Sequence, residues 1–125
     1  ERFAPGLDII TNECLHGLKY LADSRSSHAA GIVLNGCTAG IVTFNVLNNG
    51  DITPCSMLHN RIANVYADDN LEKSFRGSEI IHALLDRNYR GRCGACLYRY
   101  ECGGCRVRAE FFNKSYLDSD PLCWL

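Results

Sequence analysis

Apolar residues recur at intervals of three or four positions in several parts of the chain, which is the spacing of an amphipathic helix. This pattern predicts helices over residues 5–23, 57–66 and 106–113. A further helix is expected after Ser78, which is a favourable N-cap, and Gly91 is expected to end that helix.

Two β-branched and aromatic segments, residues 40–47 and 51–54, flank a turn sequence that ends in Asn49-Gly50. An Asn-Gly pair in this setting predicts a β-hairpin with a type I′ turn, which needs positive φ at both central residues. The hairpin would bring Cys37 and Cys55 to the same end of one ribbon, although seventeen residues lie between them. The helices and the hairpin together predict a small α+β fold that is rich in loops where the cysteines lie.

The size and charge of the chain argue against several classes of protein. Its 125 residues suit one domain, or two small lobes that share a site. A net charge of −1 argues against a general nucleic-acid or membrane-surface binder. No apolar run approaches the roughly 20 residues that span a bilayer. The chain opens at Glu1 without an apolar leader, and we interpret it as a piece of a longer protein.

The most specific signal is a run of four cysteines with the pattern C-x2-C-x5-C-x2-C. Thiolates at this density repel one another unless a soft cation binds them, so the run predicts a metal site. Structural zinc sites commonly place roughly twelve or more residues between two C-x2-C pairs, whereas only five separate the pairs here. The compact spacing instead favours an iron–sulfur cluster of the ferredoxin type. The four residues are Cys93, Cys96, Cys102 and Cys105.

The sequence around this run is strongly basic, with six arginines and one acid between positions 87 and 108. Guanidinium groups near an anionic cluster offset its charge and raise its reduction potential. Two other interpretations stay open. In one, the run holds a zinc ion in a module whose arginines contact nucleic acid or protein. In the other, the even number of cysteines forms a secreted disulfide framework, which the continuous helix and strand patterns disfavour.

Several short motifs follow one another in an order that is similar to a known family. They are Gly36-Cys37-Thr-Ala-Gly40, Pro54-Cys55, Gly91-Arg-Cys-Gly-Ala-Cys96, Cys102-Gly-Gly-Cys-Arg-Val-Arg-Ala109 and Asp120-Pro-Leu-Cys123. The order resembles the SPASM domain, the C-terminal iron–sulfur extension of radical SAM enzymes, in the branch of cofactor- and peptide-maturing and heme-biosynthesis enzymes. The match covers residues 36–124. This sequence departs from the family pattern at two points. The last cysteine pair, Cys102 and Cys105, is C-x2-C instead of C-x3-C, and Lys114-Ser115 replaces a common Gly-Asp pair.

The resemblance implies two auxiliary clusters, usually of the [4Fe-4S] type. The cluster nearer the radical SAM core would have the ligands Cys37, Cys55 and Cys105. The distal cluster would have the ligands Cys93, Cys96, Cys102 and Cys123. Cys14 is either a fourth ligand of the first cluster or a buried thiol on an apolar helix face. Residues 1–35 would be a helix and connector to the radical SAM barrel, and residues 36–125 the iron–sulfur domain.

The function implied by the resemblance is electron transfer and substrate positioning in a cytoplasmic radical SAM maturase. The expected partners are the barrel of the same protein and a peptide or tetrapyrrole substrate, with neither a membrane nor nucleic acid. The C-x3-C-x2-C loop that holds the catalytic cluster does not occur in this sequence. We therefore expect S-adenosylmethionine to bind the barrel, and the chain to be unable to cleave it alone.

Overall fold

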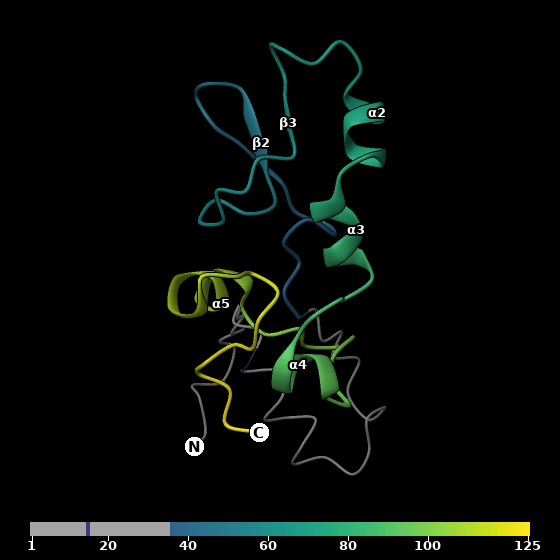
Figure 1. Ribbon diagram of the computed structural model, residues 1–125. Helices are drawn as coiled ribbons and strands as arrows, with labels where there is room; N and C mark the ends of the chain where they lie inside the picture. Colours follow the sequence, from purple (N-terminus) through teal and green to yellow (C-terminus); the bar gives the residue numbers. More distant parts are fainter. Residues whose placement is uncertain (1–14, 16–35) are drawn as a thin grey trace, which may run out of the picture.

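The computed structural model describes Leu15 and residues 36–125, and it has the predicted α+β architecture. A three-stranded antiparallel sheet and α2 lie at one end of the molecule, α4 and α5 lie at the other end, and α3 lies between them (Figure 1). The elements are β1 (Asn45–Val46), β2 (Asp51–Thr53), β3 (Ala63–Asn64), α2 (Leu71–Arg76), α3 (Glu79–Leu85), α4 (Gly91–Ala95) and α5 (Arg106–Asn113). The helix expected over residues 5–23 and Cys14 lie outside the described residues, apart from Leu15, which is helical.

The predicted hairpin is confirmed, but its turn is not of type I′. Strands β1 and β2 pair antiparallel, with Val46 opposite Ile52. The loop has three residues instead of two, because the N–H of Leu47 donates to the carbonyl of Asp51 across the strand ends at 2.8 Å. A loop of this length needs positive φ only at its last residue, and Gly50 supplies it with a φ of 84°.

The helix predicted over residues 57–66 is wrong, because this segment forms β3 instead. Strand β3 pairs antiparallel with β2, with Ala63 opposite Ile52. Leu58 and Ala63 are buried, whereas Met57 and Tyr66, which the helical pattern would place in the core, are 68% and 80% exposed. Pairing with the neighbouring strand satisfies the backbone of the segment and overrides its short helical pattern.

The N-cap prediction for α3 is confirmed, since the Oγ of Ser78 accepts from the N–H of Ile81 at 3.4 Å. The predicted end is wrong, because α3 stops at Leu85 and Gly91 begins α4. Arg87 adopts a left-handed conformation with a φ of 52°. This conformation ends the helix before the glycine is reached.

The end of α3 is a Schellman motif. The N–H of Asn88 donates to the carbonyl of Ala83 at 3.0 Å, and the N–H of Arg87 donates to the carbonyl of Leu84 at 3.3 Å. Glycine commonly occupies the left-handed position of this motif, so an arginine there gives no stop signal in the sequence.

The remaining helices divide into one that the pattern predicted and two that it did not. Helix α5 spans the predicted residues 106–113. No apolar repeat predicted α2 or α4, which have six and five residues. Helices this short depend on local capping and tertiary contacts more than on an apolar repeat. In α2 the cap is Asn70, whose side chain accepts from the N–H of Lys73 at 2.9 Å.

The core between the sheet and α3 joins the two ends of the molecule. Leu84 and Ile81 are buried on one face of α3. They pack against Gly40, where an added Cβ would lie 2.6 Å from Cδ1 of Leu84. The N–H of Gly40 also donates to the carbonyl of Pro54 at 3.0 Å, so the start of the hairpin and its end meet under α3. Among the helices of the described part of the chain, none has the length and apolar character that crossing a bilayer requires.

We expect Leu84→Ala to destabilise the protein by about 2–5 kcal/mol, because it leaves a cavity where the hairpin meets α3. The neighbouring Leu85→Ala is the matched control. Leu85 is 50% exposed whereas Leu84 is fully buried, so the control should cost less than about 1 kcal/mol. Urea unfolding followed by circular dichroism measures both, and equal losses would contradict this core assignment.

Candidate metal centre

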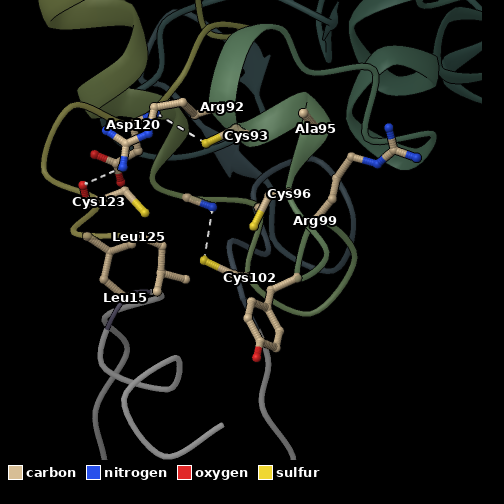
Figure 2. Close-up of a pocket in the computed structure, with 13 residues that line it drawn as sticks. Leu15, Arg92, Cys93, Ala95, Cys96, Arg99, Cys102, Asp120, Cys123 and Leu125 are labelled. Atoms are coloured by element: carbon tan, nitrogen blue, oxygen red, sulfur yellow. Dashed lines mark hydrogen bonds between the residues drawn. The ribbon is translucent and has the colours of Figure 1, made fainter. Parts of the chain in front are cut away.

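Four cysteines line one pocket with a volume of about 300 Å³. Their sulfur atoms face a common space, with Leu15 and Leu125 along one side of it (Figure 2). The four are Cys93, Cys96, Cys102 and Cys123. Three belong to the compact run and the fourth comes from the C-terminal turn, so the pocket is assembled from separate segments of the chain.

Short-range structure sets the position of each of these cysteines. Cys93 lies in α4, and Cys96 is the residue that caps the C-terminus of that helix. The N–H of Cys102 donates to the carbonyl of Tyr98 at 2.8 Å in the loop that follows. Cys123 ends a turn over residues 120–123, because its N–H donates to the carbonyl of Asp120 at 3.2 Å.

Hydrogen-bond donors point at two of the sulfur atoms. The backbone N–H of Gly104 donates to Cys102 Sγ at 3.3 Å, and the N–H of Asp120 donates to Cys93 Sγ at 3.3 Å. A guanidinium nitrogen of Arg106 lies 3.6 Å from Cys93 Sγ as a further donor. Donors of this kind stabilise negative charge on sulfur, which is the form of cysteine that binds metal.

Both positions between Cys102 and Cys105 require glycine, because of their backbone conformation and because neighbouring atoms leave no room for a side chain. Gly103 and Gly104 have φ values of 69° and 59°, a region that side chains disfavour. A Cβ at Gly103 would lie 2.0 Å from a guanidinium nitrogen of Arg87, and a Cβ at Gly104 would lie 2.8 Å from Cβ of Asp120. The turn therefore passes close to a buried arginine and a buried aspartate.

A buried ion pair connects α5 to the C-terminal turn. The guanidinium of Arg108 donates to both carboxylate oxygens of Asp120, with a shortest N–O distance of 2.6 Å. The same carboxylate accepts from the N–H of Cys105 at 2.7 Å and from that of Leu122 at 3.1 Å. Burial opposes ionisation of Asp120, but these hydrogen bonds outweigh it and hold the pKa of the carboxyl below its usual range.

The other three cysteines of the described part of the chain do not line the pocket. Cys37 is adjacent, because its N–H donates to the carbonyl of Cys102 at 2.8 Å. Cys105 is the N-cap residue of α5, and it packs against the cluster formed by Leu15 and Cys102. Cys55 forms an isolated bridge with Leu58 after β2. The pocket thus gathers four of the seven described cysteines.

The donor set of the pocket is four thiols, which are ligands of both zinc and iron–sulfur clusters. Among the described residues, no three histidine, cysteine, aspartate or glutamate side chains lie close enough together to hold a metal ion. A tetrahedral zinc ion keeps its thiolates about 3.8 Å apart, because each Zn–S bond is about 2.3 Å. Thiolates that bind different irons of one cluster lie further apart. No disulfide joins any two of the described cysteines.

The arginines near the cysteine run do not form one solvated face. Arg87 and Arg106 are buried, and both lie over the ring of Tyr89, at 5.9 and 4.0 Å from its centroid. Arg108 pairs with the buried Asp120. Sequence reasoning missed Tyr89 and the carboxylate of Asp120, since neither belongs to a metal-ligand spacing.

The chain is similar in sequence to several curated proteins that share one name. It is 34% identical over 89 residues to a protein of Oleidesulfovibrio alaskensis, with 70% of this chain and 23% of that protein covered. It is 32% identical over 89 residues to one of Nitratidesulfovibrio vulgaris, with 70% and 24% covered. It is 29% identical over 101 residues to one of Methanosarcina barkeri, with 80% and 29% covered. All three are named AdoMet-dependent heme synthase.

The chain spans about a quarter of the length of these curated relatives. No family model matches the sequence, and no solved structure matches it. The similarity therefore concerns a part of a larger type of protein.

We expect Gly36→Ala to destabilise the protein by about 1–3 kcal/mol through overpacking. An added Cβ would lie 2.0 Å from the carbonyl oxygen of Cys102, so it would break the hydrogen bond that holds Cys37 there. The matched control is Gly77→Ala, because the nearest atom to its Cβ is the carbonyl oxygen of Lys73 at 3.3 Å. Denaturant unfolding should show a smaller loss for the control, and the reverse order would contradict the Cys37 contact.

We expect Asp120→Asn to remove part of the acid sensitivity of folding. A carboxyl with a lowered pKa stabilises the fold above its unfolded pKa and loses that contribution as pH falls through its folded pKa. Breaking the buried pair should also cost about 3–5 kcal/mol at neutral pH. Thermal unfolding from pH 7 to pH 2 measures both effects. Asp118→Asn is the control, and an equally steep acid transition in Asp120→Asn would refute the assignment.

Proposed function

We propose that this chain is the auxiliary iron–sulfur domain of a radical SAM enzyme related to the heme synthases, and that it binds two [4Fe-4S] clusters. The observation that carries the proposal is the pocket lined by four cysteines from two distant segments. The similarity to AdoMet-dependent heme synthases over about a quarter of their length agrees with a domain of such an enzyme. In this proposal residues 36–125 form the domain, and residues 1–35 connect it to a barrel.

The first assignment concerns the pocket itself. Cys93, Cys96, Cys102 and Cys123 would hold one cluster. When bound, such a cluster supplies one-electron transfer. The backbone donors to the two sulfurs stabilise thiolate charge, and the apolar side chains of Leu15 and Leu125 line the same pocket.

The second assignment concerns the cysteines outside the pocket. Cys37, Cys55 and Cys105 would hold the other cluster, with Cys14 as the candidate for a fourth ligand. Two contacts support a site next to the first one. Cys37 is hydrogen-bonded to the backbone of Cys102, and Cys105 packs against the cluster formed by Leu15 and Cys102.

The chain would serve its parent protein by moving electrons to or from the substrate radical and by helping to seat the substrate. The proposed substrate class is a tetrapyrrole or a peptide, and the proposed partner is the radical SAM barrel of the same protein. S-adenosylmethionine would bind that barrel, because the C-x3-C-x2-C loop does not occur in this sequence. The proposed location is the cytoplasm.

Metal analysis of the chain, produced and purified without oxygen, tests the proposal. We expect about eight irons and eight sulfides per chain, because two cubane clusters hold four of each, with a brown colour and broad absorbance. Zinc without iron after anaerobic reconstitution would reject the iron–sulfur assignment and favour a zinc-binding module.

The division of the cysteines is tested by a pair of variants. Cys105→Ala should lose the cluster assigned to Cys37 and Cys55, while Cys123→Ala should lose the cluster of the pocket. Each variant should keep about four irons per chain, with a different electron paramagnetic resonance (EPR) spectrum for the cluster that remains. Equal loss of both clusters in both variants would count against the division.

A further inference from the structure

Arg106 is the most fully buried charged side chain beside the pocket, with an exposed fraction of 0%. It is the first residue of α5. One terminal guanidinium nitrogen donates to the carbonyls of Tyr116 and Asp118 at 2.8 and 2.7 Å. The other terminal nitrogen donates to Cys93 Sγ at 3.6 Å. The side chain therefore connects the turn before Asp120 to one sulfur of the pocket.

No carboxylate among the described residues pairs with the positive charge of Arg106. In the part of the chain that the structure describes, no carboxylate lies within 4.0 Å of its guanidinium. The nearby carboxylate of Asp120 is already paired with Arg108. An arginine stays protonated even when buried, and a buried cation without an anion is costly. Its Nε is also without a hydrogen-bond partner among the described residues.

The guanidinium is fixed in place by an aromatic ring. Tyr89 is buried, and its centroid lies 4.0 Å from Cζ of Arg106. Arg87 lies over the same ring and donates to its hydroxyl at 3.3 Å. A ring that contacts one cation on its face and a second at its hydroxyl limits movement of both. The charge of Arg106 is thus held against Cys93 and not displaced into solvent.

We propose that Arg106 is a positioning residue that sets the reduction potential of the cluster held by Cys93, Cys96, Cys102 and Cys123. This inference rests on the proposed function. A cluster with four thiolate ligands is anionic, and it gains a further negative charge on reduction. A fixed cation that donates to one of the ligand sulfurs stabilises the reduced form more than the oxidised form. Arg106 therefore raises the potential of this cluster relative to an uncharged residue at the same position.

The test is a redox titration followed by EPR on the anaerobically loaded chain. Arg106→Gln removes the charge and should raise the ratio of oxidised to reduced pocket cluster about tenfold at a fixed potential, which is 59 mV for one electron. Arg106→Lys keeps the charge and should change that ratio less than about threefold, even if the fold loses stability. The control Arg76→Gln removes a charge from an exposed pair with Glu72 in α2 and should leave the ratio unchanged.

Three results overturn the inference. The first is an Arg106→Gln titration that coincides with that of Arg76→Gln. The second is an Arg106→Lys variant that shifts as far as Arg106→Gln, because geometry and not charge would then be the cause. The third is an equal shift of both clusters in Arg106→Gln, because only the pocket cluster has Cys93 as a ligand.

Two further measurements keep the test decisive. If Arg106→Gln does not fold, pulsed EPR of the reduced wild-type chain with ¹⁵N-labelled arginine should detect a guanidinium nitrogen coupled to the pocket cluster. The absence of that coupling overturns the inference. Failure of the wild-type chain to load iron rejects the proposed function and the inference with it, whereas full loading with an unchanged potential rejects only the inference.

Discussion

The arrangement of the pocket depends on the buried carboxylate of Asp120. This group accepts from Arg108 in α5, from the N–H of Cys105 at the start of that helix, and from the N–H of Leu122 in the C-terminal turn. The backbone N–H of the same residue donates to Cys93 Sγ in α4. One residue therefore fixes three segments relative to one another, and each of them carries a cysteine. Without the carboxylate, the backbone N–H groups of Cys105 and Leu122 would lose this acceptor, and Arg108 would lose its ion pair with Asp120.

The fold was predictable where the pattern was long or the turn chemistry specific. The hairpin and α5 followed from the sequence because a turn glycine and an eight-residue apolar repeat are local signals. Strand β3 was missed because it forms only by pairing with β2. The end of α3 was missed because its left-handed residue is an arginine, a choice that depends on the ring of Tyr89 and not on backbone preference.

The candidate site was predictable in its residue types and only partly in its geometry. Cysteine spacing alone grouped Cys93, Cys96, Cys102 and Cys105, whereas the pocket is lined by the first three together with Cys123. The position of Cys123 depends on the turn that Asp120 begins, which no cysteine spacing describes. The number of arginines near the cysteines can be read from the sequence. That number does not show which arginines are exposed to solvent and which are buried. Arg106 and Arg87 belong to the interior, since both are buried against one aromatic ring. Burial is a property of the tertiary structure, so composition could not supply it.

The left-handed arginine at the end of α3 restricts which residues evolution can place there. Glycine and asparagine accept a φ of 52° with little strain, but neither carries a guanidinium to the hydroxyl of Tyr89. Lysine or glutamine would keep a long side chain without relieving the backbone strain. Arginine at position 87 also restricts position 103 to glycine, because a side chain there would occupy the space of the Arg87 guanidinium. Positions 87, 89 and 103 should therefore vary together among related sequences, even though none of the three is a cysteine.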